Sequence, residues 1–150
     1  MSMQLPAPYR RGLYGTSSTL LISGVVWVVL HRVSLAHEGV MTSWSARLEP
    51  WLLTLHGAAA MAFLVVLGAL LPTHIIKGMA TRKNLLSGLV LLGVIGLLTI
   101  TGYALYYLGS DTARSVASLL HTWVGVSAPA FLLWHLLDHE KRPAARSRSR

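Results

Sequence analysis

Four long apolar segments constrain the fold of this 150-residue chain more than any other feature. They run approximately over Thr16–Val33, Trp51–Ile76, Asn84–Leu108 and Ser115–Leu137. A helix needs about 20 mostly apolar residues to cross the hydrocarbon core of a bilayer, and each segment is close to that length or longer. Only 12% of the residues are charged, against about 25% in soluble domains. The sequence therefore predicts an all-α membrane protein, a bundle of four transmembrane helices.

The links between the segments are too short to hold a second domain. Residues 34–50 form the longest link, residues 77–83 form a basic one, and residues 109–114 form a brief turn. We therefore expect one transmembrane domain over residues 1–140. Residues 141–150 are rich in arginine and serine, a composition typical of a disordered tail.

Lysine and arginine are distributed unevenly between the two predicted sides of the membrane. Ten of them lie on the side of the termini and three on the other side, at Arg32, Arg47 and Arg114. Cytoplasmic loops carry the excess of basic residues, so both termini are predicted to be cytoplasmic. The predicted location is the inner membrane of a bacterium, with several passes.

Two features of composition exclude whole classes of function. The chain has no cysteine, which excludes disulfides, thiolate metal sites, iron–sulfur clusters and covalent haem attachment. The net charge of +8 is concentrated at the termini and in one loop, which fits membrane topology better than a nucleic-acid interface. We expect contact with membrane lipid and no binding of nucleic acid.

Histidines recur in two of the apolar segments. His56 and His74 lie in the second segment, and His121 and His135 lie in the fourth. Ionisable side chains are costly inside a bilayer and mark functional interiors, and neutral imidazole is a good axial ligand for haem iron. These four histidines are therefore candidate ligands of a metal centre.

The spacing of the four histidines favours two sites at different depths. His74 follows His56 by 18 residues, about five turns, and His135 follows His121 by 14 residues, about four turns. Each pair thus shares one helix face. Both segments cross the membrane in the same direction, which brings His56 and His121 to one level and His74 and His135 to the other. The spacing predicts two haems, bound without covalent attachment, about 21–27 Å apart.

Two further histidines leave alternatives open. His139 lies one turn beyond His135 and could replace it as the inner ligand, bind a haem propionate or lie near a quinone. His31 ends the first segment and could replace His56 as the partner of His121, although its edge position favours a propionate or interfacial role. Arg114 lies about two turns before His121, where a cation could pair with a haem propionate or a lipid headgroup.

The third and fourth segments carry a pattern that resembles a known group. The pattern comprises Thr101-Gly102-Tyr103, Tyr106-Tyr107, Arg114, His121-x-x-x-Gly125 and His135-x-x-x-His139. It is similar to bacterial cytochrome b561-like proteins, a superfamily that includes the four-helix cytochrome b subunits of formate dehydrogenases and hydrogenases. The resemblance covers roughly residues 50–140. It implies two b-type haems in a four-helix bundle, with His121 and His135 on opposite haems and His56 opposite His121.

The chain departs from those dehydrogenase subunits at one position. Their remaining ligand comes from the cytoplasmic side of the first helix, whereas the first segment here has only His31, at its predicted outer end. His74 is the better candidate for the inner site. A smaller relative, with both ligand pairs on the second and fourth segments, fits the sequence better.

The expected function is electron transfer between the quinone pool and a periplasmic redox protein, with a bound quinone as a candidate ligand and a multihaem cytochrome c as a candidate partner. The chain is too small to hold a flavin or molybdenum domain, so it is expected to be a non-catalytic subunit of an oxidoreductase complex in the respiratory chain. The alternative is a cofactor-free membrane anchor or assembly subunit. A small transporter that uses the histidines as proton relays is a third interpretation, disfavoured because no aspartate or glutamate lies in the middle of a segment.

Overall fold

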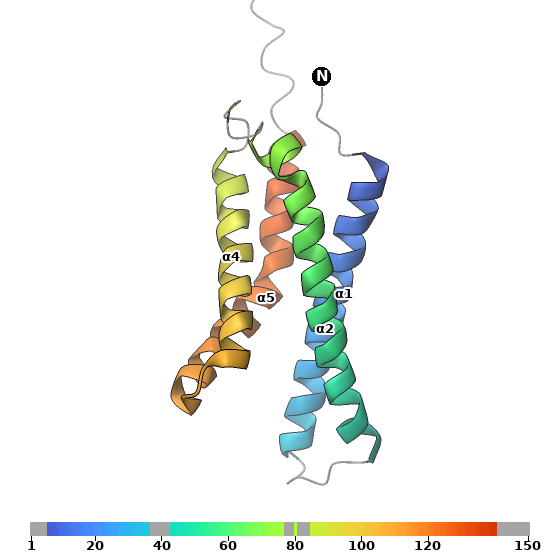
Figure 1. The fold of residues 1–150 in the computed structure, drawn as a ribbon, viewed down its shortest axis with the longest axis vertical. Coiled ribbons are helices and arrows are strands. Elements are labelled where there is room, and N and C mark those ends of the chain that lie inside the picture. The colour runs from blue at the N-terminus through green and yellow to red at the C-terminus, as the bar shows by residue number, and fades with distance from the viewer. Residues whose placement is uncertain (1–5, 37–42, 77–79, 81–84, 141–150) are drawn as a thin grey trace, which may run out of the picture. The chain divides into compact units, whose positions relative to one another are not determined.

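The computed structural model describes residues 6–36, 43–76, 80 and 85–140, and over these residues the regular structure is entirely helical. The chain divides into two compact units, Met1–His74 and Ile75–Arg150. Each unit is a hairpin of two long helices (Figure 1).

The first hairpin consists of α1 (Ala7–Ala36) and α2 (Ser43–Leu70), which lie side by side and run in opposite directions (Figure 1). α2 continues into η1 (Leu71–Ile75), a turn of π-helix that contains Pro72. Proline has no N–H to donate to the carbonyl four residues earlier, and a π turn is one way to accommodate that lost bond.

The second hairpin consists of α4 (Leu85–Tyr107) and α5 (Asp111–Glu140), again antiparallel (Figure 1). Ser110 precedes α5 and accepts a hydrogen bond from the backbone N–H of Ala113 at 3.4 Å, the geometry of a helix N-cap. Asp111 places a negative charge in the first turn, where the helix dipole favours it.

All four helices are long and apolar enough to cross a membrane, which confirms the four predicted segments. The shortest, α4, has 23 residues and is about 34 Å long, just above the thickness of the hydrocarbon core. The helices are mostly longer than the apolar segments because they continue into polar sequence. α1, for example, begins at Ala7 and includes Arg10 and Arg11, whose long side chains can reach the membrane surface.

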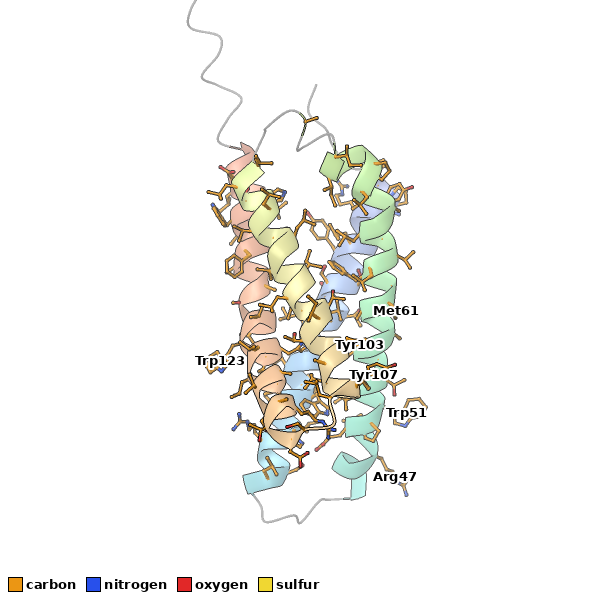
Figure 2. The ribbon with its side chains drawn as sticks, turned by 60° about the vertical axis from the view of Figure 1, so that its left-hand side comes forward. Arg47, Trp51, Met61, Tyr103, Tyr107 and Trp123 are labelled. Atoms are coloured by element: carbon orange, nitrogen blue, oxygen red, sulfur yellow. The ribbon has the colours of Figure 1, made fainter. Side chains whose placement is uncertain are left out.

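Large apolar side chains cover the outside of both hairpins, as expected for helices in contact with lipid. Trp51 and Met61 on α2 and Trp123 on α5 point away from the helices beside them (Figure 2), and Trp51 and Trp123 are more than 70% exposed. In water such a surface would cause aggregation, whereas in a bilayer it is solvated by the lipid tails. The chain is thus a multi-pass membrane protein by the length and composition of its helices.

Candidate functional site

His56 on α2 is held by a serine and a glycine of α1. Its Nδ1 lies 3.0 Å from Oγ of Ser23, a residue that is only 2% exposed. The hydroxyl of Ser23 donates to the carbonyl of Thr19 at 2.6 Å, so its oxygen accepts from Nδ1–H of His56. Beside Ser23, a Cβ atom on Gly24 would lie 3.1 Å from Cε1 of His56, so the imidazole packs directly against the glycine.

His121 on α5 is held by α4 in the same way. Its Nδ1 lies 3.0 Å from Oγ1 of Thr101, which is 6% exposed and donates to the carbonyl of Leu97 at 2.7 Å. A Cβ atom on Gly102 would lie 3.2 Å from Cε1 of His121. The threonine and the glycine after it thus position this imidazole.

His135, four turns further along α5, repeats the arrangement with one addition. Its Nδ1 lies 3.1 Å from Oγ of Ser87, and a Cβ atom on Gly88 would lie 3.5 Å from its Cε1. Ser87 is 1% exposed and donates to Oδ2 of Asp138 at 3.0 Å. At this site the hydroxyl that holds the histidine is therefore itself hydrogen-bonded to the carboxylate of Asp138.

The three arrangements share a feature that we call the hydroxyl–glycine pair: Ser23-Gly24, Ser87-Gly88 and Thr101-Gly102. Ser23, Ser87 and Thr101 are the only buried polar or charged side chains in the part of the chain that the structure describes. Each hydroxyl gives its proton to an oxygen and so accepts from Nδ1–H of a histidine across the hairpin. This bond fixes the tautomer in which Nε2 carries the lone pair that a metal ion takes.

The geometry matches the usual support of a metal-binding histidine. Such histidines donate one ring N–H to a neighbouring oxygen, which sets the tautomer and the orientation of the ring. No group of three or more histidine, cysteine, aspartate or glutamate residues that could hold a bare metal ion occurs among the described residues. Haem iron takes only its axial ligands from the protein, so one or two imidazoles meet its needs. Each of His56, His121 and His135, taken by itself, therefore has the support that an axial ligand of haem needs.

The remaining predicted residues divide into two groups. The backbone of His74 lies in η1 and that of His139 in α5, but both side chains, like all of His37, lie outside the described residues. Arg114 is described: its Nη2 donates to the carbonyl of Leu108 at 2.8 Å, which ties α5 to the end of α4. That bond accounts for one donor of Arg114, and its pairing with a propionate stays a prediction.

His31 has surroundings unlike those of His56, His121 and His135. Its Nδ1 lies 3.3 Å from Oε2 of Glu49 on α2, and its ring stacks on Trp27 with a centroid distance of 4.7 Å. It thus has a charged partner and an aromatic neighbour in place of a hydroxyl–glycine pair. This difference separates His31 from the three histidines that hydroxyl–glycine pairs hold.

The hydroxyl partners of the histidines were not predicted from the sequence, although it carries a signal for them. Ser87 and Thr101 are 14 residues apart, as are His121 and His135. Two antiparallel helices that each carry a polar residue at this spacing can pair both positions in one register. The recognisable pattern is a serine or threonine followed by glycine inside an apolar segment.

Comparison of the chain with known protein families, with curated proteins and with solved structures found no match.

Proposed function

We propose that this chain is a membrane cytochrome b that binds two haems and relays electrons between a quinone and a redox partner protein. The main argument for the proposal is that hydroxyl–glycine pairs hold the imidazoles of His56, His121 and His135. One such bond would be a common contact between membrane helices. Three of them, each accepting from Nδ1 of a histidine, are what haem ligation requires of the protein.

The proposed ligand pairs follow the depths predicted from the sequence. His56 and His121 would hold one haem, and His74 and His135 the other, with His139 in place of His135 as the alternative for the inner site. When bound, haem iron would supply one-electron redox chemistry. The chain's own contribution would be to hold the imidazoles in one tautomer and to keep water away from them.

The two haem environments would differ. The hydroxyl behind His121 donates to a helix carbonyl, whereas the hydroxyl behind His135 donates to the carboxylate of Asp138. A carboxylate at the end of such a chain makes the imidazole a stronger electron donor to iron and so favours the ferric state. We expect the haem at His135 to have the lower reduction potential for this reason.

Two glycines of α4, Gly93 and Gly96, also favour the binding of haem. No described atom lies within 4 Å of the position that a Cβ atom would occupy at Gly93 or Gly96. Contact between α4 and α5 therefore does not explain the lack of a side chain there. A flat macrocycle against α4 would use such a surface.

The test is the haem content of His121→Ala, measured on detergent-purified protein as the pyridine haemochrome. We expect the wild-type chain to carry two haems and the variant to lose about half of that content, because one axial ligand of one site is removed. Thr99→Val is the control, since the Thr99 hydroxyl bonds to the carbonyl of Ile95 in its own helix. A wild-type protein that stays colourless after haem is supplied would refute the proposal and favour the cofactor-free anchor.

A further inference from the structure

A second group of polar side chains lies in the first hairpin, near the end that carries residues 37–42. Glu49 on α2 receives two hydrogen bonds from α1, one from Nδ1 of His31 at 3.3 Å and one from Oγ of Ser34 at 3.1 Å. The Glu49 side chain is 13% exposed and that of His31 is 43% exposed. The carboxylate is thus enclosed, while the imidazole is open to the surroundings.

Trp27 completes the group and carries an unmet hydrogen-bonding need. Its ring is nearly parallel to that of His31, with an angle of 11° between the planes. Its Nε1 is buried and has no hydrogen-bond partner among the described residues. A buried donor without an acceptor costs about 1–3 kcal/mol, so an acceptor brought by a ligand would be bound favourably.

We propose that His31, Glu49 and Trp27 bind the head group of a hydroquinone and accept one of its protons. A membrane quinol has a flat ring with a hydroxyl at each end and an apolar tail that stays in lipid. Trp27 would donate Nε1–H to a ring oxygen, and the ring oxygen nearer His31 would donate its proton to Nε2. This inference rests on the proposed function for the quinone and for the electron acceptor, whereas the binding of the head group can be tested without haem.

The hydrogen bond to Glu49 prepares His31 for this task. A carboxylate only accepts, so Nδ1 carries the proton and Nε2 is the basic nitrogen. When Nε2 takes a proton, the imidazolium that forms is stabilised by the carboxylate 3.3 Å away. The exposed side of His31 then offers the proton a route out.

The reaction balances with ferric haem as the oxidant. The hydroquinone loses two electrons, which reduce two ferric haem centres of the proposed cytochrome to the ferrous state. Both O–H bonds break and both ring C–O bonds become carbonyls. One proton passes to Nε2 of His31, the proton of the other ring oxygen is released to the surroundings, and the product is the quinone.

Two other roles for His31, Glu49 and Trp27 are pairing with a haem propionate and a purely structural ion pair. Each of them explains fewer of the observed contacts than a hydroquinone site does. A propionate at His31 would be an anion close to the carboxylate of Glu49, which repels it. An ion pair with only a structural role would explain His31 and Glu49 but not the buried indole N–H of Trp27. The hydroquinone site uses all three residues.

The first experiment tests binding and needs no haem. The probe is 2-heptyl-4-hydroxyquinoline N-oxide, a fluorescent quinol analogue whose emission falls on binding, titrated into the purified full chain. We expect saturable binding that weakens about tenfold in Trp27→Phe, which keeps the ring but removes the N–H. Trp123→Phe, on the exposed face of α5, is the matched control and should bind as the wild type does. No saturable binding, or equal affinity in both variants, would overturn the site.

The second experiment tests proton acceptance by stopped-flow reduction of the haem with decylubiquinol in liposomes. Glu49→Gln keeps an acceptor for Ser34 but removes the charge, and should slow reduction by quinol about 100-fold. Haem content and full reduction by dithionite should match the wild type, as they should in the control Asp111→Asn, an exposed carboxylate of the second hairpin. A wild-type rate in Glu49→Gln would overturn proton acceptance while the cytochrome proposal stands. A wild-type chain without haem would defeat that proposal, and the binding titration would still decide the site.

Discussion

Replacing the glycines that touch histidines gives a graded test of the proposed ligand geometry. In Gly102→Ala the new Cβ would lie 3.2 Å from Cε1 of His121, and in Gly24→Ala it would lie 3.1 Å from Cε1 of His56. Carbon atoms prefer about 3.5–4.0 Å, so the imidazole must move by at least about 0.3 Å in the first variant and about 0.4 Å in the second. In Gly88→Ala the distance to His135 is already 3.5 Å, and no movement is required.

The movement has a calculable cost. It pulls the imidazole away from a hydroxyl at 3.0 Å, and loss of such a bond costs about 1 kcal/mol. Alanine also favours the helix over glycine by about 1 kcal/mol, and this gain would conceal the loss in a comparison with the wild type. Gly15→Ala in α1 is therefore the reference, because it gains the same helix preference and its new Cβ meets no described atom within 4 Å.

The assay is thermal unfolding in detergent, followed by circular dichroism, together with haem titration of the haem-free chain. Against Gly15→Ala, we expect Gly102→Ala to be less stable by about 1 kcal/mol and to bind haem about fivefold more weakly. Gly24→Ala should show a slightly larger effect and Gly88→Ala almost none. Equal stability and equal haem affinity across the series would refute the packing of imidazole against glycine.

Two further variants separate the roles of neighbouring residues. Thr101→Val keeps the branched shape but removes the hydroxyl that accepts from Nδ1–H of His121, and it should lower the free energy of unfolding by about 1–3 kcal/mol. The control Thr99→Val should change the free energy of unfolding little. Equal effects of the two variants on unfolding in detergent would contradict the role of Thr101. Arg114→Gln should hardly change the free energy of unfolding, because the side chain is 49% exposed. If Arg114 pairs with a propionate, the variant should transfer its haem faster to an excess of apomyoglobin. An unchanged transfer rate would remove Arg114 from the site.

The limits of prediction from sequence are clearest at the histidines. Helical periodicity placed His121 and His135 on one face of a helix, and α5 confirms that both lie on a single helix. Helical periodicity does not mark Gly88 and Gly102 as neighbours of histidines, because a glycine looks alike in sequence whether it faces lipid or an imidazole. Only the register of α4 against α5 shows that each lies against a histidine.

Glu49 shows the opposite case. By sequence it belonged to the link before the second segment, so it was not considered with His31, which ends the first. The structure starts α2 at Ser43, six residues before Glu49, and the antiparallel pairing of α1 and α2 brings the two side chains together. Apolar character marks where a helix meets lipid, but it does not mark where the helix ends.

The four apolar helices follow from the order of the amino acids alone, because the bilayer requires long runs of apolar residues whose backbone bonds are satisfied within each helix. Which hydroxyl meets which histidine does not follow from that order. The pairing depends on the register between antiparallel helices, set by contacts between residues 20 to 48 positions apart along the chain. Residues so distant become neighbours only when both helices pack, and the equal spacings of Ser87–Thr101 and His121–His135 permit that register without requiring it.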